Sequence, residues 1–357
     1  MTTSHVKYTY LIFLFFISVN IVYSQSEIEV SDTVKIKTDT AYIKQYPDQL
    51  TLKLFTITKS NKISLFDPLL NSTIQYGPNQ KANLGIGMNY KWLGFGLAFN
   101  LGGSKNNDDD IYGETKQFDM QINAYSRKFT FDTYLQNYTG YYLLDPQKYN
   151  SIWTDTLPFP QRPDIKTLAL GFSGIYTFKY NKLSYRSSFI FNERQKKSAG
   201  SFLLGGYFSL LAIVGDSSLI PLEVKNNINP KNDIVASVAL NYGPAFGYVH
   251  TFVIYKHYFI TMSLILGISK QKINTYTVNP EYNVDKGTIS GRTQTRLAFG
   301  INKDKWFLGI SAINDNYAFN NKNDNKDISR LNYEFGNVRF FYGRRFNVKK
   351  TKIEKDL

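Results

Sequence analysis

The chain has 357 residues, a formal net charge of +14, 27 tyrosines, 27 phenylalanines and no cysteine. The lack of cysteine excludes structural disulfides and also the lipidated N-terminal cysteine of a lipoprotein. The basic residues are scattered, with no helical stripe, zinc-ligand spacing or recognisable nucleic-acid fold beside them, so we expect no nucleic-acid partner.

The first 24 residues have the pattern of a secretion signal. Lys7 gives a weakly charged start, an almost wholly apolar stretch follows over 11–22, and Ser24 supplies a small residue at the expected cleavage position. The apolar stretch is about a dozen residues long, short of the roughly 20 that a membrane-spanning helix needs. We therefore predict a cleaved signal peptide over 1–24, followed by a polar periplasmic arm over 25–49.

From residue 50 onward, apolar and polar residues alternate, as in β-strands with one apolar face. In 167–180, for example, Leu170 and Phe172 alternate with Gly171 and Ser173. The break around Gly243 is interpreted as a turn or a bulge between two strands. Candidate strands lie at 50–59, 84–90, 92–101, 116–126, 129–142, 165–180, 183–192, 201–213, 235–242, 247–255, 260–270, 288–302, 306–313 and 337–346.

The connections between these strands favour a membrane barrel. Very short turns, as at 127–128 and 303–305, mostly alternate with long polar segments such as 144–164, which is typical of outer-membrane barrels. The segment 215–232 is an exception, because it is too long for the short-turn side. After the signal, no stretch approaches 18 uninterrupted apolar residues, and a closed barrel is the other structure that pairs its backbone groups internally in a bilayer.

We therefore predict an all-β fold, a transmembrane antiparallel up-and-down β-barrel of about 12 to 14 strands. The barrel would occupy residues 50–346, with a polar C-terminal tail at 347–357, in the outer membrane of a Gram-negative bacterium. A soluble β-sandwich or a small lipocalin-like barrel would also alternate, but the chain is long for a single sandwich, and the apolar face with its dense aromatics continues through nearly every candidate strand.

Several segments resemble one uncharacterised family. They are YIKQYPDQL at 42–50, YGPN at 76–79, LGIG at 84–87, YKW at 90–92 and GNVRFFYGRRF at 336–346. Together they are similar to domain of unknown function 4421 (DUF4421), a set of predicted outer-membrane proteins from Bacteroidota-type bacteria. The resemblance implies a barrel and a compartment over most of the mature chain. It implies no activity or ligand.

No catalytic, cofactor-binding or metal-binding residue is predicted. After signal removal the histidines are His250 and His257, and no sequence context marks a nucleophilic serine or an orienting acid for them. Two histidines seven residues apart do not make a metal site without further ligands. The protein is therefore expected not to be an enzyme, and the alternative is a surface enzyme acting on lipid or an envelope polymer.

The alternation predicts that a set of polar residues faces the lumen, because a charge on the lipid side would cost about 2 to 4 kcal/mol near the midplane. The set is Asp119, Gln121, Arg186, Arg292, Gln294, Arg296, Arg339 and Arg345. These residues would either line a polar channel or pocket that attracts anions, or pair with acids and fill the barrel, which is the favoured interpretation.

The function expected from these observations is passage or binding of a small hydrophilic solute, or a structural role in the envelope. The expected partners are outer-membrane lipid and lipopolysaccharide, the barrel-assembly machinery, and a small hydrophilic or anionic solute.

Overall fold

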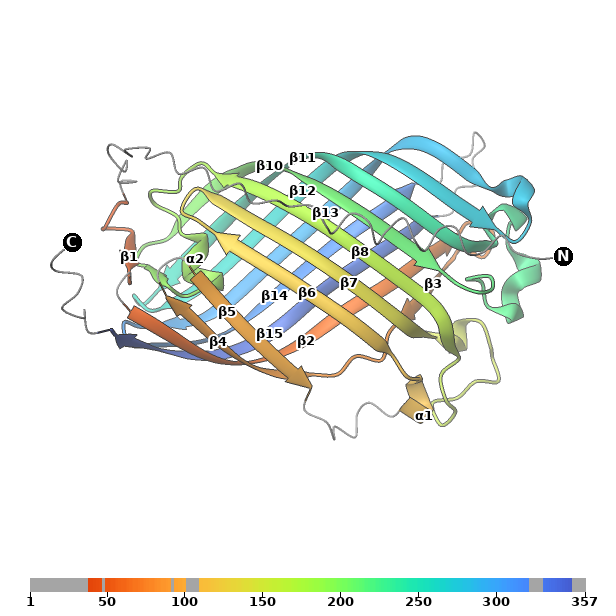
Figure 1. Ribbon diagram of the computed structural model, residues 1–357, viewed down its shortest axis with the longest axis horizontal. Coiled ribbons are helices and arrows are strands. Elements are labelled where there is room, and N and C mark those ends of the chain that lie inside the picture. The colour runs from red at the N-terminus through yellow and green to blue at the C-terminus, as the bar shows by residue number, and fades with distance from the viewer. Residues whose placement is uncertain (1–37, 47–48, 91–92, 101–108, 321–329, 349–357) are drawn as a thin grey trace, which may run out of the picture. The chain divides into compact units, whose positions relative to one another are not determined.

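The computed structural model describes residues 38–46, 49–90, 93–100, 109–320 and 330–348. The predicted signal peptide, most of the predicted arm and nearly all of the predicted tail lie outside these residues. The structure is almost entirely antiparallel β-sheet (Figure 1). Its strands are β1 (Ile43–Gln45), β2 (Gln49–Asp67), β3 (Ser72–Gly77), β4 (Asn83–Tyr90), β5 (Leu93–Asn100), β6 (Lys116–Tyr125), β7 (Phe129–Leu143), β8 (Gln161–Thr177), β9 (Glu193–Gln195), β10 (Ala199–Val214), β11 (Ile234–Ile254), β12 (Tyr258–Thr277), β13 (Val284–Asn302), β14 (Trp306–Asn320) and β15 (Arg330–Asn347).

Helices are few and short. The α-helices are α1 (Asp109–Tyr112) and α2 (Tyr185–Phe189), and short 3-10 helices lie in the connections at Pro146–Lys148, Leu222–Asn227, Pro230–Asn232 and Pro280–Tyr282. In the described part of the chain, no helix is long and apolar enough to cross a membrane.

The strands form a closed barrel, as predicted. The main sheet has 13 strands, and ten of them make a closed antiparallel ring in which β2 pairs with β15 along its whole length. β2 has two partners on its other side: its last residues pair with β3, which reaches β7, while its first half pairs with β4. The strands of this sheet outside the ring are β4, β5 and β6, and β1 and β9 form a separate two-stranded sheet.

A seam runs between β5 and β6. β5 pairs only with β4, and β6 pairs only with β7, so no ladder joins β5 to β6 among the described residues. Figure 1 shows the two strands on either side of this seam. The ring is completed past the seam by the β3–β7 pairing, which consists of Tyr76 with Leu143 and Gly77 with Tyr142.

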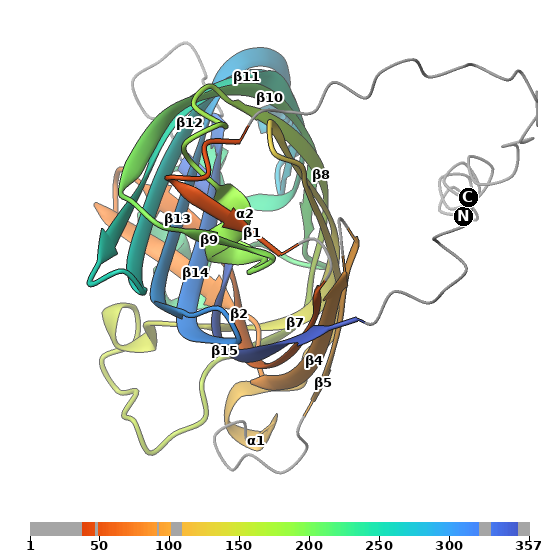
Figure 2. The ribbon, with the colours of Figure 1, turned by 90° about the vertical axis from the view of Figure 1, so that its left-hand side faces the viewer.

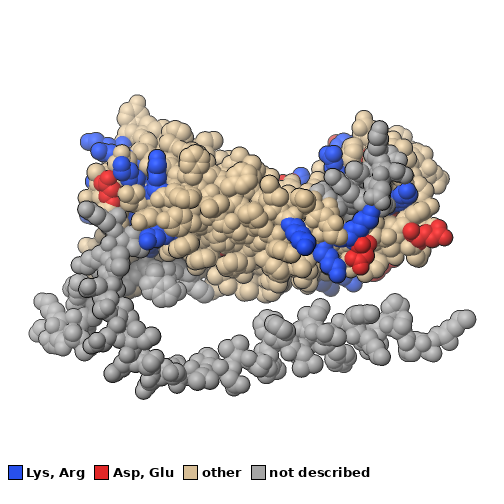
Figure 3. All heavy atoms as spheres, turned by 90° about the horizontal axis from the view of Figure 1, so that it is seen from above, with Lys and Arg blue, Asp and Glu red and all other residues tan. Residues whose placement is uncertain are grey.

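The outer surface carries an apolar belt. Along β12, buried and exposed residues alternate almost without interruption, and the exposed positions include Met262, Leu264 and Leu266. On the face drawn in Figure 3, the middle zone is nearly free of charge, and Lys, Arg, Asp and Glu gather toward the two ends. Apolar residues outside and polar residues inside are the arrangement expected of a barrel surrounded by lipid.

One predicted strand was wrong, two predicted strands are a single strand, and three short strands were missed. Residues 183–192 contain α2 instead of a strand, and 235–242 and 247–255 belong to one strand, β11. The β11–β12 register is the same on both sides of Gly243, so there is no turn or bulge there. β1, β3 and β9 were not predicted.

These corrections also explain why the segment 215–232, between β10 and β11, is too long for the side with the short turns. Without a strand at 183–192, the segment between β8 and β10 returns to the same end of the barrel as the turns at 126–128, 255–257 and 303–305. We call this the short-turn end. The long segment between β10 and β11 then falls at the opposite end with the segment between β7 and β8, and we call this the long-loop end.

A plug closes the interior at the short-turn end. α2 lies inside the ring, and β1 pairs with β9 across the opening, as Figure 2 shows end-on. We call α2, Phe191 and β9 the plug. The plug is bonded to the wall: Ser188 Oγ lies 2.6 Å from Thr261 Oγ1, and Tyr185 Oη lies 2.5 Å from Ser263 Oγ.

Phe191 fills the centre of this end. Its ring is stacked on Phe307, with centroids 4.4 Å apart, and also contacts Phe259 and Phe341. Its carbonyl oxygen accepts a hydrogen bond of 2.6 Å from the guanidinium of Arg345. A buried aromatic cluster of this kind leaves little room for water-filled passage.

The long-loop end is covered by the connection between β10 and β11. Leu219 and Ile220 are buried there against the main core, and Tyr76 Oη donates to the Leu219 carbonyl at 2.9 Å. Asn232 Nδ2 donates to Asp67 Oδ2 at 2.6 Å. The connection that did not fit the predicted pattern is therefore a cap.

Candidate binding site in the barrel interior

The inward faces of β13 and β14 carry a network of buried charges. Arg292 donates to Asp315 through Nε at 2.8 Å and through a terminal nitrogen at 2.5 Å, and Gln294 Nε2 donates to Asp315 Oδ2 at 2.8 Å. Four residues further along β13, Arg296 pairs with Asp132 of β7. Both arginines are buried and both have an acid, so their charges are neutralised within the wall.

Tyrosines surround these arginines. The Arg292 guanidinium lies over Tyr207 and Tyr317, at 5.0 and 5.2 Å from the ring centroids. Arg296 donates to Tyr125 Oη at 2.5 Å and lies 5.9 Å from the Tyr185 ring, which belongs to the plug. The middle of the barrel is thus filled by paired charges and aromatic rings.

Asp119 and Gln121 lie together on the inward face of β6. Asp119 forms an ion pair of 3.1 Å with Lys59 and accepts hydrogen bonds from Gln121, Gln136 and Tyr138. The carboxylate is therefore fully engaged by its neighbours.

Two of the predicted arginines serve the plug. Arg186 lies on α2, not on a strand, and is 3.6 Å from Glu193, which Arg127 also contacts at 2.7 Å. Arg345 holds the Phe191 carbonyl and lies 4.2 Å from the ring centroid of Tyr46.

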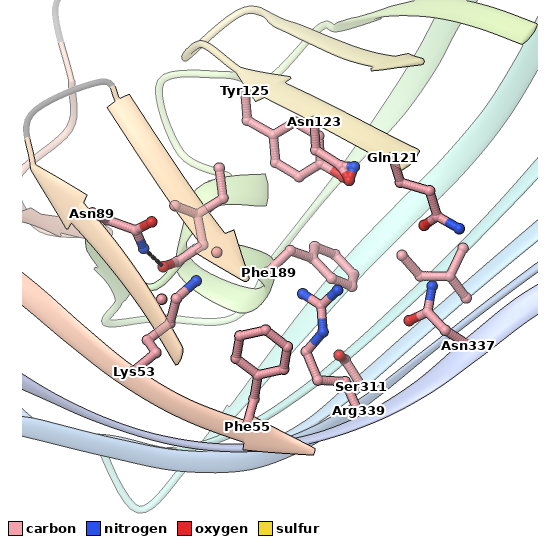
Figure 4. Close-up of a pocket in the computed structure, with 14 residues that line it drawn as sticks. Lys53, Phe55, Asn89, Gln121, Asn123, Tyr125, Phe189, Ser311, Asn337 and Arg339 are labelled. Carbon is pink, nitrogen blue, oxygen red and sulfur yellow. Dashed lines mark hydrogen bonds between the residues drawn. The ribbon is translucent and has the colours of Figure 1, made fainter. Parts of the chain in front are cut away.

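Arg339 differs from the others because, among the described residues, its side chain has no ion pair or hydrogen bond, whereas Arg345, which also lacks an acidic partner, bonds carbonyl and amide oxygens. It lies beside a cavity of about 190 Å³, which we call the seam pocket, and its Nε has no hydrogen-bond partner in the structure. Figure 4 shows the side chains that converge on this pocket. They include Lys53, Phe55, Asn89, Gln121, Asn123 and Arg339.

The seam pocket is hollow because of glycines. Gly87 of β4 and Gly96 of β5 are cross-strand partners, and both line the pocket, where other strands project side chains. Gly85, one inward position further along, leaves room for the Phe55 ring, since a Cβ there would lie 2.2 Å from a ring carbon. Phe55 in turn packs beneath the Arg339 guanidinium, 5.1 Å from the ring centroid.

The pocket is cationic. Lys53 and Arg339 are partly buried, and the remaining described lining is composed of amides, hydroxyls, glycines and apolar residues, with no carboxylate. Two like charges facing one cavity repel each other and lose hydration, so an anion placed between them would lower the free energy of the site. Arginine and lysine donate strongly to carboxylate and phosphate oxygens.

Several residues of the interior were missed from the sequence. Lys53, Asp132 and Asp315 are absent from the predicted lumen set although they lie on inward faces. Lys53 could have been found by applying the same alternation to β2, where Leu52 and Leu54 face outward. Asp132 follows from the same alternation in β7, whereas Asp315 lies beyond the predicted end of its strand at 313.

Among the described residues, neither histidine side chain is hydrogen-bonded to a serine, a threonine or a carboxylate. His250 lies on the outer face of β11, with its ring 4.2 Å from that of Phe252, and its Nδ1 is 3.2 Å from Tyr248 Oη. His257 lies in the turn before β12, 3.4 Å from Arg194. Within the described ranges, no group of three or more potential metal-ligating side chains is found.

A closed antiparallel barrel with an apolar belt and a polar interior defines the class: the fold is that of outer-membrane β-barrel proteins. The chain belongs to the family described as domain of unknown function DUF4421, whose model matches residues 37–346. Among curated proteins, none matches this sequence.

Solved structures with a similar fold are outer-membrane proteins of low sequence identity. The outer-membrane protease OmpT of Escherichia coli is 8% identical with a TM-score of 0.37, and the match covers 85% of this chain and 98% of that one. The toluene transporter TodX of Pseudomonas putida is 8% identical with a TM-score of 0.26, covering 85% and 91%. The outer-membrane protein OprG of Pseudomonas aeruginosa is 7% identical with a TM-score of 0.21, covering 85% and 99%.

Proposed function

We propose that this protein is a non-enzymatic, non-conducting barrel of the Gram-negative outer membrane that binds a small anionic molecule in the seam pocket. The observation that carries the proposal is the pair of cations, Lys53 and Arg339, which face one cavity with no acidic partner among the described residues.

The membrane location is supported by the belt of exposed apolar side chains. Leu264, Phe299 and Phe340 belong to different strands and are each close to half exposed. In water such a continuous belt would be unfavourable at about 25 cal/mol per Å² of apolar surface, whereas lipid removes that cost.

Binding is favoured over passage because the interior is occupied. Arg292 and Arg296, which would otherwise attract anions along a channel, are paired with Asp315 and Asp132. The plug closes one end, and the connection between β10 and β11 covers the other. The seam pocket combines a cavity in the barrel wall with charge that no described acid neutralises.

The test is anion binding to the purified protein in detergent, measured by equilibrium dialysis with labelled inorganic phosphate. We expect saturable binding that is lost in the double variant Lys53→Met with Arg339→Met. The control is Arg344→Met, which removes an exposed cation from β15 at the position opposite Trp306 of β14.

Equal phosphate binding by the wild type and the double variant would overturn the proposal. Folding is checked by heat modifiability, which is the change in gel mobility of a barrel on boiling. A double variant that keeps this property but loses binding separates a binding role for the cations from a structural one.

A further inference from the structure

We propose that the anion in the seam pocket is the head group of an amphiphile whose hydrocarbon chain passes between β5 and β6 into the bilayer. This inference rests on the proposed function and adds the substrate class and the route. The chemical class is a single-chain amphiphile that ends in a carboxylate or a phosphate.

The seam forms part of the pocket wall. Gly96 belongs to one edge strand, while Gln121 and Asn123 belong to the other, and all three line the cavity. Neither edge has a partner ladder toward the other among the described residues. An edge without a ladder has no row of inter-strand hydrogen bonds to break before a chain can pass.

The surface just outside the seam is apolar on both sides. Leu97 is exposed on the outward face of β5, and Phe118, Met120 and Ile122 are exposed on the outward face of β6. These are lipid-facing positions in a membrane barrel. A hydrocarbon chain that emerged at the seam would therefore leave a cationic, amide-lined pocket and enter an entirely apolar environment.

Side chains bound the pocket toward both ends of the barrel. Toward the short-turn end, Phe189 and Ile190 line the pocket, and Asn89 Nδ2 donates to the Ile190 carbonyl at 2.7 Å. Toward the long-loop end, Asp119 is held by Lys59 and Tyr138. The pocket is cationic, side chains bound it toward both ends of the barrel, and the seam beside it opens between apolar outer faces. These features fit a head group with a hydrocarbon chain better than a freely soluble ion.

The decisive comparison is between ligands with and without a chain. We expect decyl phosphate or decanoate to bind at least about tenfold more tightly than inorganic phosphate or acetate in the same micelles, because part of the chain is buried against protein. The two head groups distinguish a phosphate site from a carboxylate site. The preference should disappear in the Lys53→Met, Arg339→Met double variant.

A blocking variant tests the route. A Cβ at Gly96 would make ordinary contacts, the nearest at 3.6 Å, so a side chain can start there without a clash and Gly96→Phe adds a ring beside the seam. Gly291→Phe is the matched control, because this exposed glycine has no atom nearer than 3.9 Å to a built Cβ and lies on β13. Gly96→Phe should abolish the tighter binding of decyl phosphate, and Gly291→Phe should not.

The position of the chain can be measured with a single fluorophore, because the protein has no cysteine of its own. A bimane label at Leu97→Cys should be quenched by a chain-brominated decyl phosphate, whereas a label at Leu266→Cys on β12 should not.

The outcomes separate the two proposals. Cation-dependent binding of inorganic phosphate, without tighter binding of decyl phosphate and without selective quenching at position 97, overturns the amphiphile and leaves the proposed function in place. If the double variant binds inorganic phosphate and decyl phosphate as tightly as the wild type does, both proposals are overturned.

Discussion

Arg292 and Asp315 form a two-hydrogen-bond ion pair inside the barrel, with both side chains only 3% exposed. The two residues lie on neighbouring strands but are not directly opposite, since Asp315 is the cross-strand partner of Gln294. From the alternation alone, the charge of Arg292 would be assigned to the wall of a channel. Because Asp315 neutralises this charge, the interior next to the cationic seam pocket is neutral at this position.

The first prediction concerns this pair. Asp315→Asn should lower the free energy of unfolding by about 3–5 kcal/mol, because it leaves Arg292 buried without a counter-charge. The measurement is urea unfolding in detergent, followed by heat modifiability. Asp145→Asn is the matched control, since Asp145 pairs with Lys148 on the exposed surface and should cost less than about 1 kcal/mol. Equal effects at the two positions would contradict a buried pair.

The second prediction concerns conduction. In planar bilayers the wild-type protein should give no stable current steps, because paired charges, tyrosines and the plug occupy the interior. A known porin inserted under the same conditions is the positive control. Regular steps with anion preference would show instead that Arg292 and Arg296 line an open pore.

The third prediction concerns Phe191, which has a φ of 68°, in the left-handed region that favours glycine. Phe191→Ala should destabilise the protein by about 3–5 kcal/mol through loss of its aromatic contacts. Phe191→Gly loses the same contacts but relieves the backbone, so it should be the more stable of the two by about 1 kcal/mol. Thermal unfolding in detergent measures both, with Phe202→Ala on the outer face as control. The reverse order would be inconsistent with this backbone conformation.

The fourth prediction concerns pH and the arm that contains β1. Asp304, in the turn between β13 and β14, lies 3.0 Å from Lys44 and 2.9 Å from Arg194, and accepts a 2.7 Å hydrogen bond from Tyr46. Burial opposes ionisation of Asp304, but the hydrogen bonds from Tyr46 and Lys44 and the charges of Arg194 and Lys44 outweigh it, so its pKa is lowered. Burial, followed by the hydrogen bond to Asp304, raises the pKa of Tyr46.

Because the pKa of Asp304 is lower in the folded state, its contribution is present above the ordinary aspartate pKa of about 3.9 and is lost as pH falls through the folded value. A spin label at Ala41→Cys should therefore be equally immobile at pH 7 and 5 and become mobile near pH 3. Asp304→Asn should leave the label mobile at every pH. If the mobility of the label changes neither with pH nor in Asp304→Asn, Asp304 does not hold the arm.

The sequence alone determined which residues face outward. The two-residue period of a strand assigns alternate side chains to opposite faces, so Arg292, Gln294 and Arg296 could be placed inside and Leu297 outside before any pairing was known. The barrel followed from the same period, because repeated apolar faces without long apolar helices need a closed sheet in a bilayer.

Only the tertiary structure decided what those residues meet. Residues 183–192 alternate like a strand, yet the apolar residues there pack inside the ring as a plug, because a local pattern does not distinguish burial in lipid from burial in the lumen. The partners of Arg296 and Arg339 also depend on strands distant in sequence. Arg296 pairs with Asp132 of β7. Arg339 instead lies beside a cavity, because the inner face of β4 and β5 carries glycines there.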